Sequence, residues 1–370
     1  MKLTGLRIAL IGPLPPPAGG MANQTRQLHE LLSAEGACVE VVQVNAPYRP
    51  AWMGKLQGVR ALARLLPYLN ALWQAAGRAD VFHVMANSGW SWHLFAAPAI
   101  WIGSLRGVPV VVNYHGGEAE SFLREHLASF RRTLARASLL AVPSGFLEDV
   151  FSRFGIRSQV VSNVVDLARF HPAAPGRVAE PHLVVARNLE AIYGIDTALQ
   201  AFVHILQRWP GARLSLAGSG PQEKVLRDRV EALGLGAQVC FTGRLDREAM
   251  ASLIRSADLM LNPSRVDNMP ISILEALASG VPVVSTDVGG IPYLVRHGES
   301  ALLVPRDDPA SMAGAALRIL SDPALAGRLR ESGLREVKSY SWSVVREHWA
   351  HAYSEAGLGR SRPIVQGVQV

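Results

Sequence analysis

The chain alternates short β-type runs with helical patterns, and it does so twice. In the first half, β-type runs fall at residues 7–12, 38–44, 80–85, 108–113, 138–142 and 159–162. The alternation restarts in the second half, with runs at residues 182–186, 213–217, 239–242, 258–262, 282–285 and 301–304. Strands that alternate with helices form parallel sheets, because each crossover helix returns the chain to the same edge of the sheet. The sequence therefore predicts two α/β domains, each built on a doubly wound, Rossmann-like parallel sheet.

A chain of 370 residues is also too long for a single hydrophobic core. The stretch FHPAAPG at residues 170–176 has the composition of a linker. We expect an N-terminal domain over residues 1–176 and a C-terminal domain over 177–340, with an aromatic-rich helix at about 341–356 packing back on the first domain. Ligands bind at the carboxyl ends of such sheets, so two domains facing across a cleft would suit the joining of two substrates.

Composition places the protein among globular chains, because 49% of its residues are hydrophobic and 18% are charged. Cys38 and Cys240 have no Cys-x-x-Cys or His neighbours, which favours a reducing compartment without a disulfide framework or zinc site. The first apolar run breaks at Gly12, too early for a secretory signal, and no apolar run is suited to span a membrane. We expect a cytoplasmic location.

The excess positive charge lies in the first half, where residues 1–176 hold 16 basic and 10 acidic side chains. Residues 41–79 are basic with no acid, around a helical pattern that places Arg60 and Arg64 opposite one apolar face. That face is formed by Trp52, Leu56, Val59, Leu62, Leu66, Leu69 and Trp73. Two interpretations stay open: a helix packed on its sheet with solvated arginines, or a surface that docks on anionic lipid headgroups at the membrane. No nucleic-acid recognition motif is present.

Two candidate sites follow strands of the first half. Gly19 and Gly20 precede a predicted helix, where backbone amides can approach an anion closely, although a glycine pair in a turn is often only structural. The absence of a G-x-G-x-x-G motif weakens a dinucleotide-dependent dehydrogenase. His115 follows the fourth strand, where its imidazole can hydrogen-bond a sugar hydroxyl or titrate, or can simply be a polar surface residue.

In the second half, Arg187 lies just beyond a strand, and its fixed fork of donors suits a phosphate. Gly218 begins a tight Gly-Ser-Gly-Pro turn after the next strand. No Asp-x-Asp motif occurs, so charge on a leaving diphosphate would be stabilised by arginine and helix N-termini, without a metal ion or other cofactor.

The stretch from Asn262 to Gly280 is the most informative. We expect Pro270 in the first turn of a helix, Asp267 or Asn268 as its cap, and Gly280 at its end. Glu275 lies inside this apolar helix, where a buried carboxylate needs a partner such as the vicinal hydroxyls of a ribose. The alternative is that Asp267 only caps the helix and Glu275 only joins a salt bridge. Both carboxylates would lie on one nucleotide-binding element, which does not favour a hydrolase.

Taken in order, these motifs resemble those of the retaining, two-Rossmann (GT-B) glycosyltransferases of family 4, over nearly the whole chain. The family's glycine-rich first loop matches Gly19-Gly20, and its His-Gly matches His115-Gly116. Its other motifs match Asn163-Val-Val-Asp166, Gly218-Ser-Gly-Pro221, the pair Asp267 and Glu275, and Gly280-Val-Pro-Val-Val284.

The resemblance implies transfer of a sugar from a nucleotide diphosphate with retained anomeric configuration. It assigns catalytic roles to His115, Arg187 and Asp267: His115 would hydrogen-bond the donor sugar, Asp267 would lie beside it, and Arg187 would neutralise the diphosphate. Glu275 would hold the ribose. It assigns further contacts with the donor to Gly19, Gly20, Gly218, Asn268, Met269 and Ile271.

Two positions depart from the family pattern. The family pairs its arginine with a lysine six residues later, and here that position is Tyr193, which carries no charge at neutral pH. Asp267 replaces a glutamate and is one methylene shorter. The expected protein is still a metal-independent glycosyltransferase in surface polysaccharide or glycolipid synthesis. It would use a UDP- or GDP-linked sugar and a saccharide or lipid-linked acceptor, with Arg60, Arg64, Trp52 and Trp73 on the membrane or acceptor side. The alternatives are a non-catalytic sugar-nucleotide-binding or scaffold protein and a nucleotide-sugar epimerase.

Overall fold

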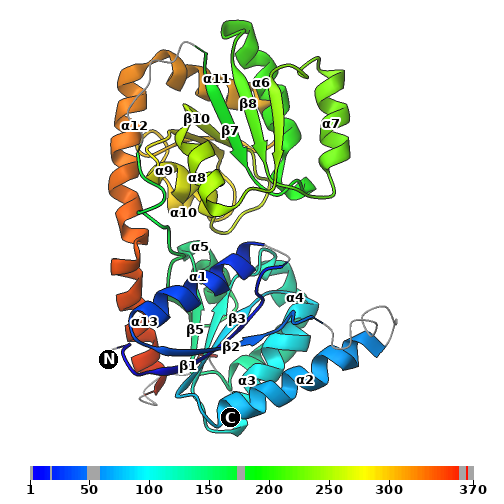
Figure 1. Ribbon diagram of the computed structural model, residues 1–370, viewed down its shortest axis with the longest axis vertical. Coiled ribbons are helices and arrows are strands. Elements are labelled where there is room, and N and C mark those ends of the chain that lie inside the picture. The colour runs from blue at the N-terminus through cyan, green and yellow to red at the C-terminus, as the bar shows by residue number, and fades with distance from the viewer. Residues whose placement is uncertain (1–2, 17–18, 48–58, 173–179, 358–363, 366–370) are drawn as a thin grey trace. The chain divides into compact units, whose positions relative to one another are not determined.

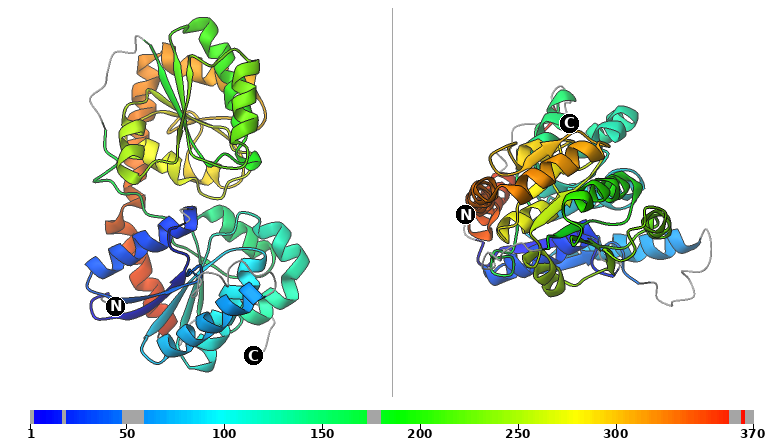
Figure 2. Two further views of the ribbon diagram at one scale, coloured as in Figure 1. Left: turned by 45° about the vertical axis from the view of Figure 1, so that its right-hand side comes forward. Right: turned by 90° about the horizontal axis from the view of Figure 1, so that it is seen from above.

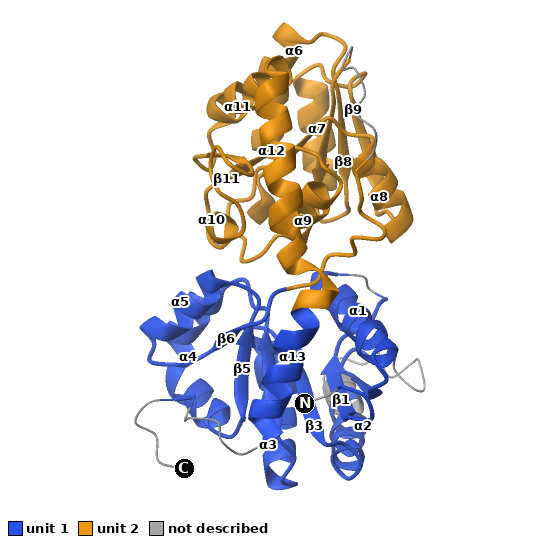
Figure 3. Ribbon diagram, turned by 90° about the vertical axis from the view of Figure 1, so that its left-hand side faces the viewer, with its two compact units in different colours: residues 1–162, 345–370 blue, residues 163–344 orange. Residues whose placement is uncertain are grey.

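The computed structural model describes residues 3–16, 19–47, 59–172, 180–357 and 364–365, without the side chains of residues 59–63. The chain divides into two compact units (Figure 3), which are described separately below. Unit 1 comprises Met1–Ser162 and Val345–Val370, and unit 2 comprises Asn163–Val344. The expected boundary at residue 176 is therefore too late. The residues just after 162 belong to unit 2 because Val165 and Phe170 are buried in its core.

Unit 1 is built on a six-stranded parallel sheet with the strand order β2-β1-β3-β4-β5-β6 (Figure 1). Its strands are β1 Arg7–Gly12, β2 Cys38–Gln43, β3 Val81–Ala86, β4 Val110–Tyr114, β5 Leu139–Val142 and β6 Gln159–Val160. The chain builds outward from β1 to β2 and then reverses direction from β3 onward. The crevice between the carboxyl ends of β1 and β3 is therefore the topological switch point of this sheet, where ligands of open α/β sheets bind.

Helices cover both faces of this sheet (Figure 2). They are α1 Gly20–Ala34, α2 Val59–Ala76, the π-helix η2 Trp92–Ala96, α3 Ala97–Leu105, α4 Ala119–Leu134, α5 Gly145–Arg153 and α13 Trp342–Gly357. A core of buried apolar side chains lies between the sheet and α2, η2, α3, α4 and α5. On the other face, α13 packs through Trp349 and Tyr353, whose rings lie 4.6 and 5.9 Å from the ring of His83 on β3.

Unit 2 has a second six-stranded parallel sheet, with the order β12-β11-β10-β7-β8-β9. Its strands are β7 His182–Ala186, β8 Arg213–Ala217, β9 Val239–Gly243, β10 Leu259–Asn262, β11 Val283–Thr286 and β12 Leu302–Val304. The direction of winding reverses between β7 and β10, so the switch point of unit 2 lies at the carboxyl ends of these two strands.

The helices of unit 2 flank its sheet as in unit 1 (Figure 2). They are η3 Ala191–Tyr193, α6 Ile195–Arg208, α7 Glu223–Ala232, α8 Arg247–Arg255, α9 Ile271–Ala278, α10 Ile291–Leu294, α11 Pro309–Ser321, α12 Pro323–Glu336 and η4 Val337–Tyr340. Two apolar clusters, one on each face of the sheet, form the core. The expected fold class of two doubly wound α/β domains is confirmed.

Helix α2 does not bury the apolar face that its sequence pattern indicates. Tyr68 and Leu72 are buried, whereas Leu66 and Trp73 on the expected core face are 63% and 49% exposed. The side of α2 that packs against the sheet is thus rotated from the predicted side by about one residue, which is roughly 100° around the helix axis. Helix α2 consequently carries a second apolar stripe that is open to solvent. No helix in the described part of the chain is long and apolar enough to cross a membrane.

Candidate functional site

The switch point of unit 2 gathers charged side chains from separate segments. Arg187 follows β7 directly, and Asp267 lies in the loop between β10 and α9. The two side chains form an ion pair, and each is only 11% exposed. Because β7 and β10 are neighbours in the sheet, residues that are 80 positions apart in sequence meet at one edge.

The guanidinium of Arg187 is held from several directions. It donates to Ser264 Oγ from Nη2 at 3.0 Å and from Nε at 3.3 Å. Ser264 Oγ in turn donates to Asn262 Oδ1 at 3.2 Å. Burial lowers the pKa of Arg187 to about 10, while the electrostatic influence of Tyr193 and Glu275 acts in the opposite direction. The side chain therefore stays charged at neutral pH, in a fixed orientation.

Tyr193, which replaces the family lysine, contributes a ring in place of a charge. Its ring centroid lies 4.4 Å from Cζ of Arg187, which is the geometry of a cation–π contact. The ring thus stabilises the guanidinium at the position where a lysine would repel it.

The loop that carries Asp267 is fixed mainly through its backbone. Asp267 Oδ1 accepts from the amide of Met269 at 3.2 Å, and the amide of Gly290 donates to the Asp267 carbonyl at 2.8 Å. The residue before the first turn of α9 is Pro270, whose φ of −70° and ψ of 107° are extended. Pro270 therefore occupies the cap position itself, and the expectation that Asp267 or Asn268 caps the helix is wrong. The carboxylate folds back on its own loop and on Arg187 instead.

The C-terminal end of α9 is as expected. Gly280 has a φ of +68° and donates to the carbonyl of Leu277, so it ends the helix in a left-handed conformation. Between these ends lies Glu275. Burial raises the pKa of Glu275 to about 7, although the charges of Arg247 and Arg187 act in the opposite direction. A carboxylate in this environment is a strong acceptor for a hydroxyl donor.

Several glycines of unit 2 are required by close backbone contacts. A Cβ on Gly218 would lie 2.0 Å from the Arg187 carbonyl oxygen, and one on Gly220 would lie 2.3 Å from that of Leu189. A Cβ on Gly290 would lie 1.8 Å from the carbonyl oxygen of Asn268. These glycines let the loops of Arg187 and Asp267 pack closely against neighbouring backbone. Packing therefore explains why residue 218 is a glycine. The expected contact of Gly218 with the donor stays a prediction.

The first-strand loop of unit 1 differs in this respect. Gly19 precedes α1 with extended backbone (φ −156°, ψ 170°), and Gly20 is the first helical residue. No described atom lies within 4 Å of a Cβ built on either glycine. No contact with a described side chain or backbone therefore explains why these two positions are glycines. Binding of a phosphate by the first amides of α1 stays a prediction.

His115 follows β4, and the buried polar residues Asn113 and His83 lie on β4 and on the neighbouring strand β3. Burial lowers the pKa of His115 to about 4, so the imidazole is neutral at neutral pH. Its Nε2 and the Oδ1 of Asn113 are both buried and have no hydrogen-bond partner among the described residues. The Asn113 amide donates to Nε2 of His83 at 3.2 Å, and Nδ1 of His83 lies 2.8 Å from the Tyr353 hydroxyl. Helix α13 thus orients a polar group next to His115, a connection that sequence reasoning missed.

The glycine after His115 also has a structural cause. A Cβ on Gly116 would lie 2.2 Å from Ser88 Oγ and 2.5 Å from the Tyr114 hydroxyl. These two oxygens are hydrogen-bonded at 2.8 Å, and the His115 amide donates to the Ala86 carbonyl. The segment after β3 is therefore packed directly against the His115-Gly116 motif.

The structure brings four of the candidate residues together: Arg187, Tyr193, Asp267 and Glu275 are linked by contacts or electrostatic coupling within unit 2. Asn268, Met269 and Ile271 adjoin them in the same loop and the first turn of α9. Gly19, Gly20 and His115 lie at the carboxyl edge of the sheet in unit 1. Trp52 and the side chain of Arg60 lie outside the described residues, and Arg64 and Trp73 are on α2.

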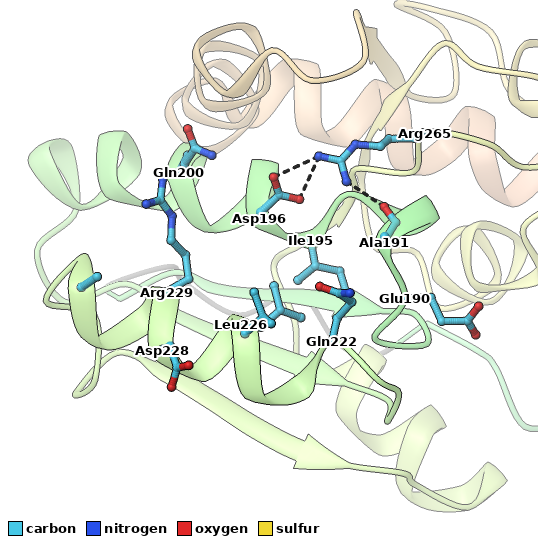
Figure 4. A pocket seen from close by; sticks show the side chains of 12 residues that line it. Glu190, Ala191, Ile195, Asp196, Gln200, Gln222, Leu226, Asp228, Arg229 and Arg265 are labelled. Carbon is cyan, nitrogen blue, oxygen red and sulfur yellow. Dashed lines mark hydrogen bonds and ion pairs between the residues drawn. The ribbon is translucent and has the colours of Figure 1, made fainter.

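A groove of about 510 Å³ opens beside this site, between α6 and α7 (Figure 4). It includes Glu190 and Ala191 from the loop of Arg187 but none of the expected donor-binding residues. At its edge, Arg265 binds Asp196 at 3.0 Å and the carbonyl of Ala191 at 2.7 Å (Figure 4). Arg265, which sequence reasoning missed, ties the loop after β10 to the start of α6.

No three His, Cys, Asp or Glu side chains of the described residues form a metal-binding group. The independence of the reaction from a metal ion stays a prediction.

Comparison with known families agrees with this geometry. Residues 18–169 match the family description "Glycosyltransferase Family 4", and residues 170–336 match "Glycosyl transferases group 1". The chain belongs to the group 1 glycosyltransferases of family 4 and has their two-domain GT-B fold.

Named relatives cover the chain almost end to end. It is 26% identical to the glycogen synthase of Mycobacterium tuberculosis, over 97% of each chain. It is also 26% identical to the phosphatidyl-myo-inositol mannosyltransferase of that organism, over 96% of this chain and 98% of the relative. Among solved structures, HepE of Anabaena in complex with UDP and glucose superimposes with a TM-score of 0.73. That similarity extends over 94% of this chain and 99% of HepE at 19% identity, and it concerns the fold.

Proposed function

We propose that this glycosyltransferase moves a sugar from a UDP- or GDP-linked donor to a saccharide or lipid-linked acceptor, with retention of anomeric configuration and without a metal ion. The observation that carries the proposal is the joint placement of Arg187, Asp267 and Glu275 at the switch point of unit 2. The buried guanidinium at this edge matches the negative charge of a diphosphate. The two carboxylates match the hydroxyl groups of its ribose and sugar, which can donate to them. The complex of HepE with UDP and glucose supports the same donor class.

Each residue has a distinct role in this proposal. Glu275 accepts from the ribose hydroxyls, and Asp267 lies beside the donor sugar. Arg187 and the backbone amides of Asn268, Met269 and Ile271 bind the diphosphate oxygens. When the bond between the anomeric carbon and the leaving oxygen breaks, the electron pair stays on the diphosphate, and the guanidinium stabilises its charge.

Retention follows if the acceptor attacks from the face that the diphosphate leaves. The acceptor hydroxyl forms the new bond to the anomeric carbon, and its proton passes to the leaving phosphate oxygen. This route needs no nucleophile from the protein. His115 is uncharged at neutral pH, because burial lowers its pKa to about 4. Its imidazole is therefore suited to hydrogen-bond a sugar hydroxyl rather than to act as a charged acid.

Mass spectrometry with a panel of UDP- and GDP-sugars, with and without a lipid extract, tests the reaction. The expected result is release of free nucleotide that accelerates with an acceptor-containing extract. Saturable binding without release would identify a scaffold protein, and conversion of the donor without any acceptor would identify an epimerase.

Variants test the roles of the residues. Glu275→Ala should mainly weaken nucleotide binding, whereas Arg187→Ala should mainly lower kcat, because its contribution grows as charge develops on the leaving group. Arg296→Ala, at a side chain that is 73% exposed, is a matched control. Equal, small effects of the first two variants would contradict the assignment.

The lipid-linked acceptor and a peripheral location at the membrane rest on helix α2. Leu66 and Trp73 form an exposed stripe, and the guanidinium of Arg106 lies 4.5 Å from the ring of Trp73. Apolar side chains with adjacent arginines suit an anionic membrane surface. The mannosyltransferase relative, whose name includes a phosphatidyl lipid, supports this acceptor class. Arg64→Gln and Trp73→Ala should weaken binding to phosphatidylglycerol vesicles, and the loss for Arg64→Gln should shrink at high salt.

A further inference from the structure

An exposed aromatic cluster lies in unit 1 where the segment after β3 meets α4, the helix that follows the His115-Gly116 motif. Trp90 is 78% exposed, the largest exposure among the large hydrophobic side chains of the described residues. It lies in the segment that follows β3, which is one of the two strands at the point where the winding reverses. Neither the sequence pattern nor the donor site of unit 2 accounts for an indole at this place.

The backbone around Trp90 is held in place from both sides. Ser88 packs on Gly116 and is hydrogen-bonded to Tyr114, as described above. Gly89, with a φ of +66°, accepts from the amide of Trp92 at 3.0 Å. The side chain of Trp92 is buried and stacks on Phe130 at 4.1 Å. The exposed indole is thus presented from a fixed segment.

Two imidazoles continue the surface that Trp90 begins. The ring of His93 lies 6.3 Å from that of Trp90 and 5.2 Å from that of His126, both edge to face. Phe122 supports both imidazoles, at 5.8 and 5.0 Å. The local backbone is irregular on both sides, because His93 lies in the π-helix η2 and His126 interrupts α4 with φ −122° and ψ 18°. Such π-helical turns occur frequently at functional sites.

The chemistry of this cluster distinguishes between ligands. An exposed indole face attracts the weakly positive C–H groups on one side of a pyranose ring. Imidazole nitrogens can hydrogen-bond hydroxyl groups at the ring edge. A carboxylate lies beside the cluster, since Glu125 Oε2 is 3.8 Å from Nε2 of His126. Arg124, two positions before His126 in α4, is paired with Glu120 at 2.7 Å. An anionic lipid headgroup or a phosphate is therefore disfavoured here, in contrast with the surface of α2 around Arg106.

We infer that Trp90, His93 and His126 form a platform that binds a pyranose ring of the acceptor. The inference rests on the proposed function, because it names the part of the acceptor that unit 1 would recognise. It gives Trp90 a role in sugar specificity, separate from the lipid contact proposed for Trp73.

Saturation-transfer NMR on the full chain tests the platform directly. The probes are methyl α- and β-pyranosides of glucose, galactose, mannose and N-acetylglucosamine, with UDP binding measured by calorimetry on the same samples. At least one pyranoside should bind through the C–H groups of one ring face. Trp90→Ala should weaken that binding on the order of tenfold, and Trp90→Phe should retain part of it, because stacking on a ring is restored. Leu105→Ala, at a side chain that is 69% exposed, is the control and should leave pyranoside binding unchanged.

The two hypotheses fail in different ways. A chain that binds UDP but none of the pyranosides, or a Trp90→Ala variant with unchanged pyranoside affinity, overturns the platform and leaves the proposed function standing. Loss of phosphatidylglycerol vesicle binding in Trp90→Ala, with no pyranoside bound, would assign the surface to lipid and also overturn it. Pyranoside binding that depends on Trp90, in a chain that binds no UDP or GDP, supports the platform and contradicts the proposed donor.

Discussion

The carboxyl-edge loops of the two sheets are built differently, although the sheets share one architecture. In unit 2, Arg187 and Asp267 are paired, and the glycines around them touch backbone carbonyls at distances that admit no side chain. In unit 1, no described atom lies within 4 Å of a Cβ built on Gly19 or Gly20, and Asn113 Oδ1 and His115 Nε2 have no partner among the described residues.

This difference indicates different modes of binding. Unit 2 holds its charged groups in a fixed arrangement, which lowers the cost of ordering them around a ligand. At the carboxyl edge of unit 1, Asn113 Oδ1 and His115 Nε2 have no hydrogen-bond partner among the described residues, so a ligand with hydroxyl groups would gain by supplying one. Gly218, Gly220 and Gly290 of unit 2 are therefore required by the fold, whereas no such contact with a described atom accounts for Gly19 and Gly20.

Matched glycine substitutions give the largest expected effect. Gly290→Ala places a methyl group 1.8 Å from the Asn268 carbonyl, and we expect it to destabilise unit 2 by about 3 kcal/mol or more. Gly20→Ala meets no described atom within 4 Å and should change stability by no more than about 1 kcal/mol. Thermal unfolding of the two variants beside the parent chain measures both. Equal losses of stability would remove the distinction between the two loops.

The second prediction concerns pH, to which the two units should respond in opposite directions. The pKa of Glu275 is raised from 4.5 to about 7, so the folded state binds more protons than the unfolded state between these values. Unit 2 should therefore lose stability as pH rises from 4.5 to about 7, by at most about 1.4 kcal/mol per pH unit.

In unit 1, burial lowers the pKa of His115 from 6.5 to about 4 and that of His83 to about 3. The unfolded state then binds more protons, so unit 1 should lose stability as pH falls below 6.5. Hydrogen exchange, corrected for intrinsic rates and followed in β4 and α9, resolves the two units. Glu275→Gln should flatten the response of unit 2 only, and His115→Gln should reduce that of unit 1 only. Parallel responses of both units would contradict the assignment of these groups.

The strands were predictable because parallel strands buried on both faces read as nearly continuous apolar runs. The run at 182–186 coincides with β7, and that at 213–217 coincides with β8. The position of the charged residues of the candidate site was also predictable, since Arg187 follows β7 directly and Asp267 lies in the loop after β10. A motif that ends a strand is placed at the carboxyl edge by topology alone.

Other features depend on contacts that no local pattern contains. Helix α2 is apolar on more than one face, so its sequence cannot specify whether Leu66 or Leu72 meets the sheet. The hydroxyl of Tyr353 reaches His83 across 270 positions of sequence. Ser88 explains Gly116 only once β3 and β4 lie side by side. The role of Tyr193 as a ring against Arg187 depends in the same way on tertiary packing.

Substitution of Tyr193 should have the smallest effect of these predictions. It tests whether the charged groups of unit 2 are already arranged for a diphosphate. Tyr193→Lys restores the family residue but removes the ring beside Arg187, so the nucleotide-free protein should lose on the order of 1 kcal/mol of stability. A bound diphosphate would in turn gain a second cation, so UDP affinity should rise and should fall more steeply with salt than in the parent chain. Tyr193→Phe keeps the ring and is the control, with stability and UDP affinity near those of the parent. Calorimetric titration with UDP at low and high salt measures the difference. A lysine variant that binds UDP no more tightly would mean that the arrangement in unit 2 is complete without a second charge.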